Sequence, residues 1–405
     1  MAVHSNFQFE DFPTPYLSTH LPREADVIIV GGGLAGLLTL YYLTLDSKLN
    51  VYLLEEGALG FHSSGRDIGT INLFDSHFLK RLLEEPDKYI DQVSIFKNSL
   101  DLLNQIIREE EIQCEYQKSG GIYLGQDDKE FDTLRSLKDL LEKRLPKTIW
   151  SRTLDASEST LLTGSSYFKG GLFVASDSVY SPCKLIHGLA NICQRNDRKI
   201  LTNAIVENVT QTQDGVNIHV RNRGVITAKC VVYCSGVYTG KVVPGVNKYL
   251  LTHKQHIIAT QRIDPKLLTR LPQCGMIFNG VRIRATQDRV LMQNAPSTLN
   301  ERLYDGEINI RACENLRKLL KLFYPEIGRA EIEYVWSTIT CSGIDGLPIS
   351  GGILNRPNEY VNIGFGSSNL NAIVLASQMI KDMIMGKPAS EQLKQLFDPR
   401  RINNV

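Results

Sequence analysis

The sequence predicts a mixed α/β (α+β) protein in which a unit of buried strands and helices is joined to a second, mostly antiparallel sheet. Three observations predict this class. An apolar strand, a glycine-broken turn, an apolar helix and a second strand follow one another over residues 26–56. Short strands separated by Asp-Gly and Arg-Gly turns occupy residues 204–236, and strand-like segments continue over residues 250–291. A final amphipathic helix over residues 371–387 ends at Gly386-Lys387.

Composition indicates a globular chain with small-molecule partners. The 405 residues, 42% of them hydrophobic, suffice for two closely joined domains. The formal net charge of +1, from 45 basic and 44 acidic residues, lacks the basic excess of a nucleic-acid binder. The eight cysteines form no C-x-x-C pair, so we expect no metal site and a reduced, cytoplasmic setting. We also expect no secretory leader and no transmembrane segment, because no run has the required apolar length.

Glycines at the first strand-to-helix turn form a nucleotide-binding fingerprint. The pattern G-x-G-x-x-G directly follows the strand and opens the helix, so that backbone can approach a pyrophosphate at the helix N-terminus. Glu55 ends the next strand, where a carboxylate accepts from ribose hydroxyls, and Glu56 is the alternative in register. Such an acid favours FAD or NAD over NADP, and the fingerprint does not choose between these two. The residues assigned to the turn are Gly31, Gly33, Leu34, Ala35 and Gly36.

The segment after Glu56 favours FAD through a family resemblance. "GALGFHSSGRDIGTIN", residues 57–72, resembles the G-x-x-x-S-G-R-N-x-G segment of the D-amino-acid oxidase, glycine oxidase and sarcosine oxidase superfamily, with Asp67 at the motif's Asn. In that superfamily the loop runs along the pyrophosphate and ribityl chain to the flavin ring. The resemblance therefore implies a Rossmann-like FAD-binding domain of the glutathione-reductase type. The cofactor-contacting residues that it implies are Ser63, Ser64, Arg66, Gly69 and Thr70.

Later segments resemble the same superfamily in the same order. "AIVENV" looks like the strand whose valine backbone contacts adenine, and "VVYCSGVYTG" is similar to V-V-x-A-A-G-x-W. "GFGSSNLNAIVLASQ" resembles G-x-G-x-x-G-[IM] before the closing helix, whose N-terminus stabilises the negative charge of reduced flavin. Non-covalent FAD is expected, because no residue aligns with a covalent attachment motif. The residues implied are Val206, Cys234, Gly236, Gly366, Ser368, Asn369 and Leu370, with Asn369 in place of the usual glycine.

The substrate side departs from the resemblance. Amino-acid oxidases of the superfamily often carry W-x-G-x-R-P, whose arginine can hold a substrate carboxylate. Here Trp336 matches, but Thr340 and Cys341 occupy the Arg-Pro places, which looks more like the γ-glutamylputrescine oxidoreductase-like branch. In "VRIRATQDRVLMQ", Arg284 is in register with that branch, and Arg282 would share its face of a strand.

The catalytic candidates are therefore few, and each has a structural alternative. "THKQHIIATQR" resembles a strand beside the flavin, which would put Lys254 and Gln255 near its face. Lys254 could equally be a solvated lysine, Arg284 a member of a surface salt bridge, and Trp336 a core residue. The candidates are Lys254, Arg284, Trp336 and Thr340.

The resemblance implies an FAD-dependent amine or amino-acid oxidase or dehydrogenase that converts a C–N bond to an imine. Its partners would be a small amine or amino acid and oxygen or another electron acceptor, and an oligomer is possible. Two alternatives stay open: a D-amino-acid or glycine-type oxidase that holds a carboxylate through Arg282 or Arg284, and a catalytically impaired flavin-binding subunit or regulatory protein. We expect an FAD domain formed by residues 1–90, 150–245 and 335–405, and a substrate-binding cap formed by residues 91–149 and 246–334.

Overall fold

Parallel strands form the centre of the first sheet in this computed structural model, which describes residues 7–9, 20–45, 48–195, 199–298, 307–366 and 369–402. The strand order is β18-β19-β11-β1-β2-β8, with β10 antiparallel to both β11 and β9. β1 pairs in parallel with β11 and β2, so its apolar end is enclosed between strands and covered by helices. The strands are β1 (Glu24–Val30), β2 (Val51–Leu54), β8 (Lys199–Leu201), β9 (Val206–Gln211), β10 (Val216–Val220), β11 (Gly224–Tyr233), β18 (Ile349–Gly352) and β19 (Glu359–Ile363).

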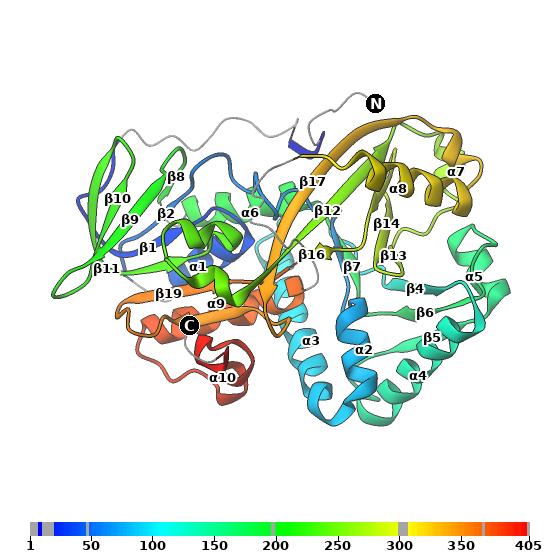
Figure 1. The fold of residues 1–405 in the computed structure, drawn as a ribbon, viewed down its shortest axis with the longest axis horizontal. Coiled ribbons are helices and arrows are strands. Elements are labelled where there is room, and N and C mark those ends of the chain that lie inside the picture. The colour runs from blue at the N-terminus through cyan, green and yellow to red at the C-terminus, as the bar shows by residue number, and fades with distance from the viewer. Residues whose placement is uncertain are drawn as a thin grey trace.

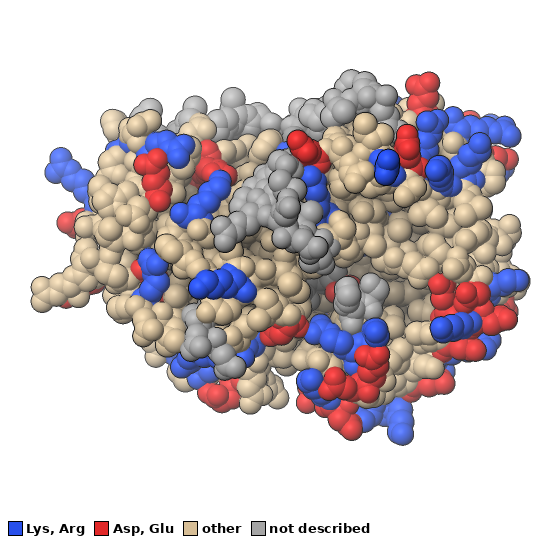
Figure 2. Space-filling model, viewed as in Figure 1, with Lys and Arg blue, Asp and Glu red and all other residues tan. Residues whose placement is uncertain are grey.

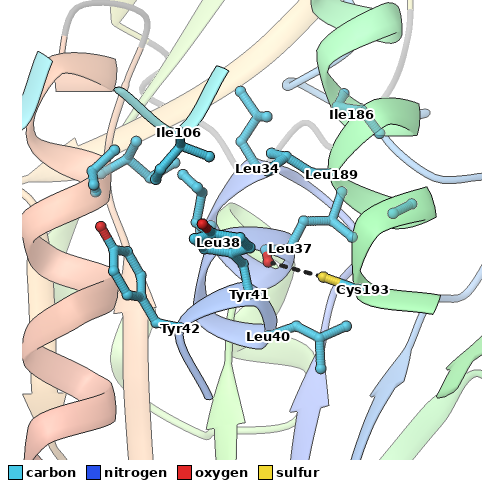
Figure 3. Close-up of a cluster of buried hydrophobic side chains, with 14 of the residues drawn as sticks. Leu34, Leu37, Leu38, Leu40, Tyr41, Tyr42, Ile106, Ile186, Leu189 and Cys193 are labelled. Atoms are coloured by element: carbon cyan, nitrogen blue, oxygen red, sulfur yellow. Dashed lines mark hydrogen bonds between the residues drawn. The ribbon is translucent and has the colours of Figure 1, made fainter. Parts of the chain in front are cut away.

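Helix α1 (Leu34–Leu45) is the central element of the core around this sheet. It is apolar on all sides, and ten of its residues are buried. Figure 3 shows its leucine and tyrosine side chains between neighbouring helices, with the Cys193 thiol directed at the Leu37 carbonyl oxygen. The neighbours in contact with it include α6 (Pro182–Arg195) and α9 (Ile373–Ile384). Because α1 is enclosed in this way, its N-terminal turn has a fixed position.

A second sheet lies beside the first and is mostly antiparallel. Its order is β16-β12-β15-β14-β13-β4-β6-β5, with β17 paired to β12; β13 and β4 form a parallel pair within it. The long strands β12 and β17 run from this sheet toward the first one (Figure 1). The strands are β4 (Gly121–Gly125), β5 (Ser151–Leu154), β6 (Gly170–Val174), β12 (Leu250–Thr260), β13 (Gly275–Phe278), β14 (Val281–Ala285), β15 (Val290–Gln293), β16 (Ser297–Thr298) and β17 (Ile332–Gly343); β3 (Thr70–Ile71) and β7 (Ser178–Val179) pair separately.

The remaining elements are helices that cover the two sheets. Pro86 stands at the first turn of α3, which separates it from α2. These helices are α2 (Ser76–Glu84), α3 (Pro86–Glu109), α4 (Asp128–Arg144), α5 (Ala156–Thr163), α7 (Pro265–Leu268), α8 (Ile310–Phe323) and α10 (Glu391–Phe397). Short 3-10 turns are η1 (Phe7–Phe9), η2 (Gly236–Lys241), η3 (Val246–Tyr249), η4 (Ile327–Arg329), η5 (Asn369–Ala372) and η6 (Pro399–Ile402).

The observed architecture confirms the predicted fold class. The strand-helix-strand unit, the hairpins of β9 to β11 and the closing helix all form where the sequence predicts them. The domain boundaries stay a prediction. Three strands that the prediction assigned to the FAD domain pair in the second sheet. These are β5 and β6, within residues 150–245, and β17, near residue 335.

The surface carries no large region of one charge on the face shown in Figure 2, where acidic and basic side chains are interspersed. This distribution matches the net charge of +1. Within the described ranges, no helix combines the length and the apolar character needed to cross a membrane.

A buried carboxylate joins the loop after β3 to the second sheet. Asp177 is fully buried and accepts hydrogen bonds from Asn72 Nδ2, the Tyr123 hydroxyl and the Leu73 backbone N–H, each at 2.9 Å. A Cβ added at Gly121 would lie 2.5 Å from Asp177 Oδ2, so the glycine makes room for this carboxylate. Burial raises the pKa of Asp177 to about 6, in spite of the three donors.

We therefore predict a pH-dependent stability effect for Asp177→Asn. A pKa raised from 3.8 to about 6 means that ionisation costs more in the folded state, so the contribution of Asp177 is full below about pH 4 and lost above about pH 6. The free energy of unfolding of the variant, relative to the parent, should rise by about 3 kcal/mol between these limits. Denaturant unfolding at several pH values measures it. Asp214→Asn, at an exposed turn, is the control, and a pH-independent difference for Asp177→Asn would contradict the prediction.

Candidate active site

A cavity of about 400 Å³ lies at the carboxyl ends of the parallel strands. Its walls come from the residues that directly follow β1, β2, β11 and β19, together with Thr338–Cys341 of β17. Carboxyl ends of parallel strands meet at one edge of a sheet, which is where ligands bind in open α/β sheets. The cavity therefore reaches from the glycine-rich turn of the first sheet to a strand of the second.

The glycine-rich turn has the geometry that a dinucleotide requires. Gly31 has a φ of +114°, and an added Cβ would lie 2.8 Å from the Cys234 carbonyl oxygen. A Cβ at Gly36 would lie 1.9 Å from the Gly31 carbonyl oxygen, so side chains are excluded where helix and strand meet. Ser64 Oγ accepts from the backbone N–H of Leu34 at 3.2 Å, which places a hydroxyl at the N-terminus of α1. This is the point at which the helix favours negative charge.

Two adjacent acids line the cavity in different ways. Glu55 is buried and accepts from the backbone N–H groups of Gly32 at 2.6 Å and Gly57 at 2.8 Å; burial raises its pKa. Glu56 Oε1 accepts a hydrogen bond from His62 Nε2 at 2.8 Å, and this bond lowers the pKa of Glu56. Glu55 thus orders the glycine-rich turn, while Glu56 and His62 form a polar pair at the wall.

Most of the predicted cofactor residues lie around one cavity. Gly36, Arg66, Gly69 and Thr70 stand outside its lining, and Ser368 lies outside the described residues. Asn369 begins η5, but its side chain is likewise outside the described part of the chain. The predicted residues that line the cavity are Gly31, Gly33, Leu34, Ala35, Glu55, Glu56, Ser63, Ser64, Val206, Cys234, Gly236, Gly366 and Leu370, together with Thr340.

Two buried arginines of β14 hold the loop that follows the glycine-rich turn. Arg282 Nη2 pairs with Asp67 Oδ2 at 2.7 Å, and its Nη1 donates to Thr70 Oγ1 at 3.3 Å. Arg284 Nη1 donates to the carbonyl oxygens of Ile68 at 2.8 Å and Gly69 at 3.2 Å, and also to that of Tyr180. We call these two arginines and the loop of residues 66–70 the loop clamp.

The far side of the same loop is fixed by β17. Trp336 Nε1 donates to the Arg66 carbonyl oxygen at 2.9 Å, and Arg66 Nη1 donates to the Ser337 carbonyl oxygen at 3.1 Å. Trp336 is buried and packs with Ile68, so it is a structural member of the site and is not part of the cavity lining. The loop is thus bound to the second sheet along its whole length.

The loop clamp changes the interpretation of the arginines. Asp67 stands where the resembling motif has Asn, and the structure pairs this carboxylate with Arg282. Arg284 is engaged by main-chain carbonyls, and burial lowers its pKa. Neither guanidinium is presented to the cavity lining, so the arrangement does not support either arginine as a carboxylate anchor.

Lys254 lies apart from the cavity lining. It alternates with Gln255 along β12, so the two side chains are on opposite faces of the sheet. Its side chain is on the face that carries His256, whose pKa is lowered by burial and then by the charge of Lys254. Its placement therefore favours a structural role over contact with a flavin.

Two threonines of β17 are presented to the cavity. Thr338 and Thr340 line it, are 3% and 7% exposed, and their hydroxyls have no hydrogen-bond partner among the described residues. The sequence reasoning identified Thr340 and missed Thr338, although the two-residue period of a strand puts both on one face. It also missed Tyr238 and Asn362, whose place in the lining has no local signal.

These features fit FAD. The side-chain-free glycines, the N-terminus of α1 and Ser64 suit a diphosphate, and Thr338 and Thr340 line the same cavity. A family model described as FAD dependent oxidoreductase (DAO) matches residues 26–383. The chain belongs to this family. FAD is its cofactor.

Individual relatives of this DAO-family chain are distant. The 4-methylaminobutanoate oxidase (formaldehyde-forming) of Paenarthrobacter nicotinovorans is 22% identical over 274 residues, covering 67% of this chain and 32% of that protein. The mitochondrial pyruvate dehydrogenase phosphatase regulatory subunit of Mus musculus is 26% identical over 220 residues, covering 54% and 24%. The chain thus spans about a third and a quarter of these relatives. Glycine oxidase from Geobacillus kaustophilus shares the fold, with a TM-score of 0.77, 19% identity and coverage of 91% and 96%.

The loop clamp predicts a strong coupling between Arg282 and Asp67. Arg282→Met should leave the partly buried Asp67 carboxylate without its counter-ion and lower the free energy of unfolding by up to about 3 kcal/mol. Asp67→Asn in the same chain should recover at least half of that loss, because it removes the charge and keeps an acceptor for the Gly69 N–H. Denaturant unfolding of the four proteins of this double-mutant cycle measures the coupling.

An exposed pair supplies the control for this cycle. Arg262 pairs with Asp288 at 3.2 Å, but its side chain is 80% exposed, so Arg262→Met should change stability little. Strictly additive effects of Asp67→Asn and Arg282→Met would show that the pair is not coupled and would refute the loop clamp as described.

Proposed function

We propose that this flavoprotein oxidises a C–N bond of a small amine or amino acid to an imine, which water then hydrolyses. Bound FAD supplies the acceptor for the hydride equivalent. The observation that carries the proposal is that one cavity is lined both by the dinucleotide turn at Gly31 and by a polar wall, Thr338 and Thr340 of the second sheet.

The chain's own residues would mainly position the reactants. The loop clamp holds residues 66–70 against the second sheet, and Glu55 orders the glycine-rich turn. Thr338 and Thr340 offer hydroxyls that can donate or accept at the wall. Burial of these groups excludes water, which strengthens each hydrogen bond made to a bound molecule.

The names of the relatives support an amine. The relatives include a 4-methylaminobutanoate oxidase, a dimethylglycine dehydrogenase and a sarcosine dehydrogenase, each at or below 24% identity. The alternative of a D-amino-acid or glycine-type oxidase with Arg282 or Arg284 as carboxylate anchor has less support, because both guanidinium groups are engaged by the loop. Within this proposal FAD is bound non-covalently, and the acceptor of its electrons is oxygen or another oxidant.

A second function has one specific observation in its favour. The similarity to a pyruvate dehydrogenase phosphatase regulatory subunit covers 54% of this chain. A flavin-binding regulatory protein would keep the dinucleotide turn and need no competent substrate wall. The threonine hydroxyls line the cavity assigned to FAD, which would be occupied in either function, so the two functions are separated by reactivity toward substrates.

Anaerobic mixing with a panel of amines and amino acids separates these functions. We predict that at least one compound of the panel bleaches the absorbance of oxidised flavin, because hydride transfer from a C–N carbon reduces it. Thr340→Val, which removes a hydroxyl but keeps the shape of the side chain, should slow that bleaching about tenfold while FAD stays bound. The measurement is stopped-flow absorbance on the FAD-loaded protein.

The control is chemical reduction. Dithionite should bleach the flavin of both proteins equally. If dithionite acts and no compound of the panel does, the proposed oxidation of a C–N bond fails and the regulatory function is favoured.

A further inference from the structure

The side chain of Asn362 connects the two helices whose N-termini line the cavity. Asn362 lies on β19, and its Nδ2 donates to Thr39 Oγ1 of α1 and to Ser377 Oγ of α9, each at 3.0 Å. The cavity lining includes Leu34 and Ile373, the first residues of these two helices. A single amide is therefore bonded to both of the helices whose N-termini would meet bound FAD.

The neighbours of this amide determine the direction of each hydrogen bond. The Thr39 hydroxyl donates to the Ala35 carbonyl oxygen at 2.7 Å, so Thr39 Oγ1 must accept from Asn362. The nitrogen of Asn362 therefore faces the two helices, and its Oδ1 accepts from Ser350 Oγ on β18 at 3.0 Å. All four side chains of the cluster are fully buried: Thr39, Ser350, Asn362 and Ser377. Both amide hydrogens and the amide oxygen are thus satisfied by protein atoms.

Stability alone does not explain a buried polar cluster between two helices. Burial of polar side chains costs desolvation, which their hydrogen bonds offset, and apolar side chains of similar shape would stabilise the packing of α1 on α9 at least as well. A well-attested use of a buried polar group is to fix one register between helices, because sliding breaks its bonds. Thr39 is the sixth residue of α1 and Ser377 the fifth of α9, so each lies within about 8 Å of its helix N-terminus.

We propose that Asn362 is a positioning residue that fixes α9 against α1 and so sets how strongly the protein favours reduced over oxidised FAD. The N-terminus of α1, at the glycine-rich turn, suits the diphosphate, whose charge is the same in both states. The N-terminus of α9 is then left for the flavin half of the molecule. Reduction adds negative charge to the flavin, and a helix N-terminus stabilises such charge only over a short distance. The inference rests on bound FAD and does not depend on which compound is oxidised.

Redox titration of the FAD-loaded protein tests this role. Asn362→Leu keeps nearly the shape of the side chain and removes the amide, so α9 loses its bonded position against α1. The variant should favour reduced FAD about tenfold less than the parent, which is a midpoint potential about 30 mV lower for a two-electron couple. Thr39→Val removes the acceptor on α1 and should shift the potential in the same direction. Thr39→Ser keeps the hydroxyl and should have the potential of the parent.

Thr163→Val is the matched control. Thr163 is a fully buried threonine of α5 whose hydroxyl donates to the Ser159 carbonyl oxygen at 2.6 Å, the same type of bond that Thr39 makes within its helix, and it does not line the cavity. Its substitution can lower the denaturant midpoint of unfolding but should leave the potential unchanged. If Asn362→Leu does not fold, the threonine variants carry the test.

Three results would overturn the proposal. The first is an unchanged potential in Thr39→Val or in folded Asn362→Leu, which would show that the bonded position of α9 has no effect on the flavin. The second is a shift in Thr39→Ser equal to that in Thr39→Val, which would assign the effect to packing and not to the hydroxyl. The third is a similar shift in Thr163→Val, which would assign it to lost stability.

Discussion

The contact between the loop of residues 66–70 and the buried arginines of β14 determines how the two sheets are related at the cavity. Arg282 and Arg284 reach the loop from the second sheet, while Ser64, just before the loop, bonds to the start of α1. Guanidinium groups suit this task because their planar donors can engage a carboxylate or several carbonyls at once. The dinucleotide turn and the polar wall therefore keep a fixed separation.

The same contact decides the electrostatics of the substrate side. A cation buried near a flavin would attract an anionic substrate, but Asp67 neutralises Arg282, main-chain carbonyls engage Arg284, and Thr340 replaces the arginine expected from the family resemblance. What is left at the wall is uncharged and capable of hydrogen bonding. This combination suits neutral polar groups better than carboxylates, because a carboxylate bound there would be a buried charge without a counter-ion, which is costly.

Packing explains how the glycine-rich turn keeps a backbone conformation that excludes side chains at Gly31 and Gly36. Gly31 and Gly36 leave no room for a Cβ, and α1 is buried on all sides between helices and the first sheet. A turn with this geometry persists only where its surroundings hold it, and here the Glu55 carboxylate bonds to Gly32 and Gly57 at its base. The core around α1 and the Glu55 carboxylate thus hold the glycine-rich turn in place together.

The sequence by itself determined the fold class and the glycine-rich turn, and most of the cofactor residues that it predicted line the cavity. Their signals are local: strand and helix periods, glycine spacing, and an acid at the end of the next strand. Only the tertiary structure decided that Arg282 pairs with Asp67, 215 residues away, and that Asn362 is bonded to both α1 and α9. It also assigned β5 and β6 to the second sheet. Strand pairing and buried ion pairs join segments that are distant in sequence, so the helix and strand periods of the sequence do not predict them.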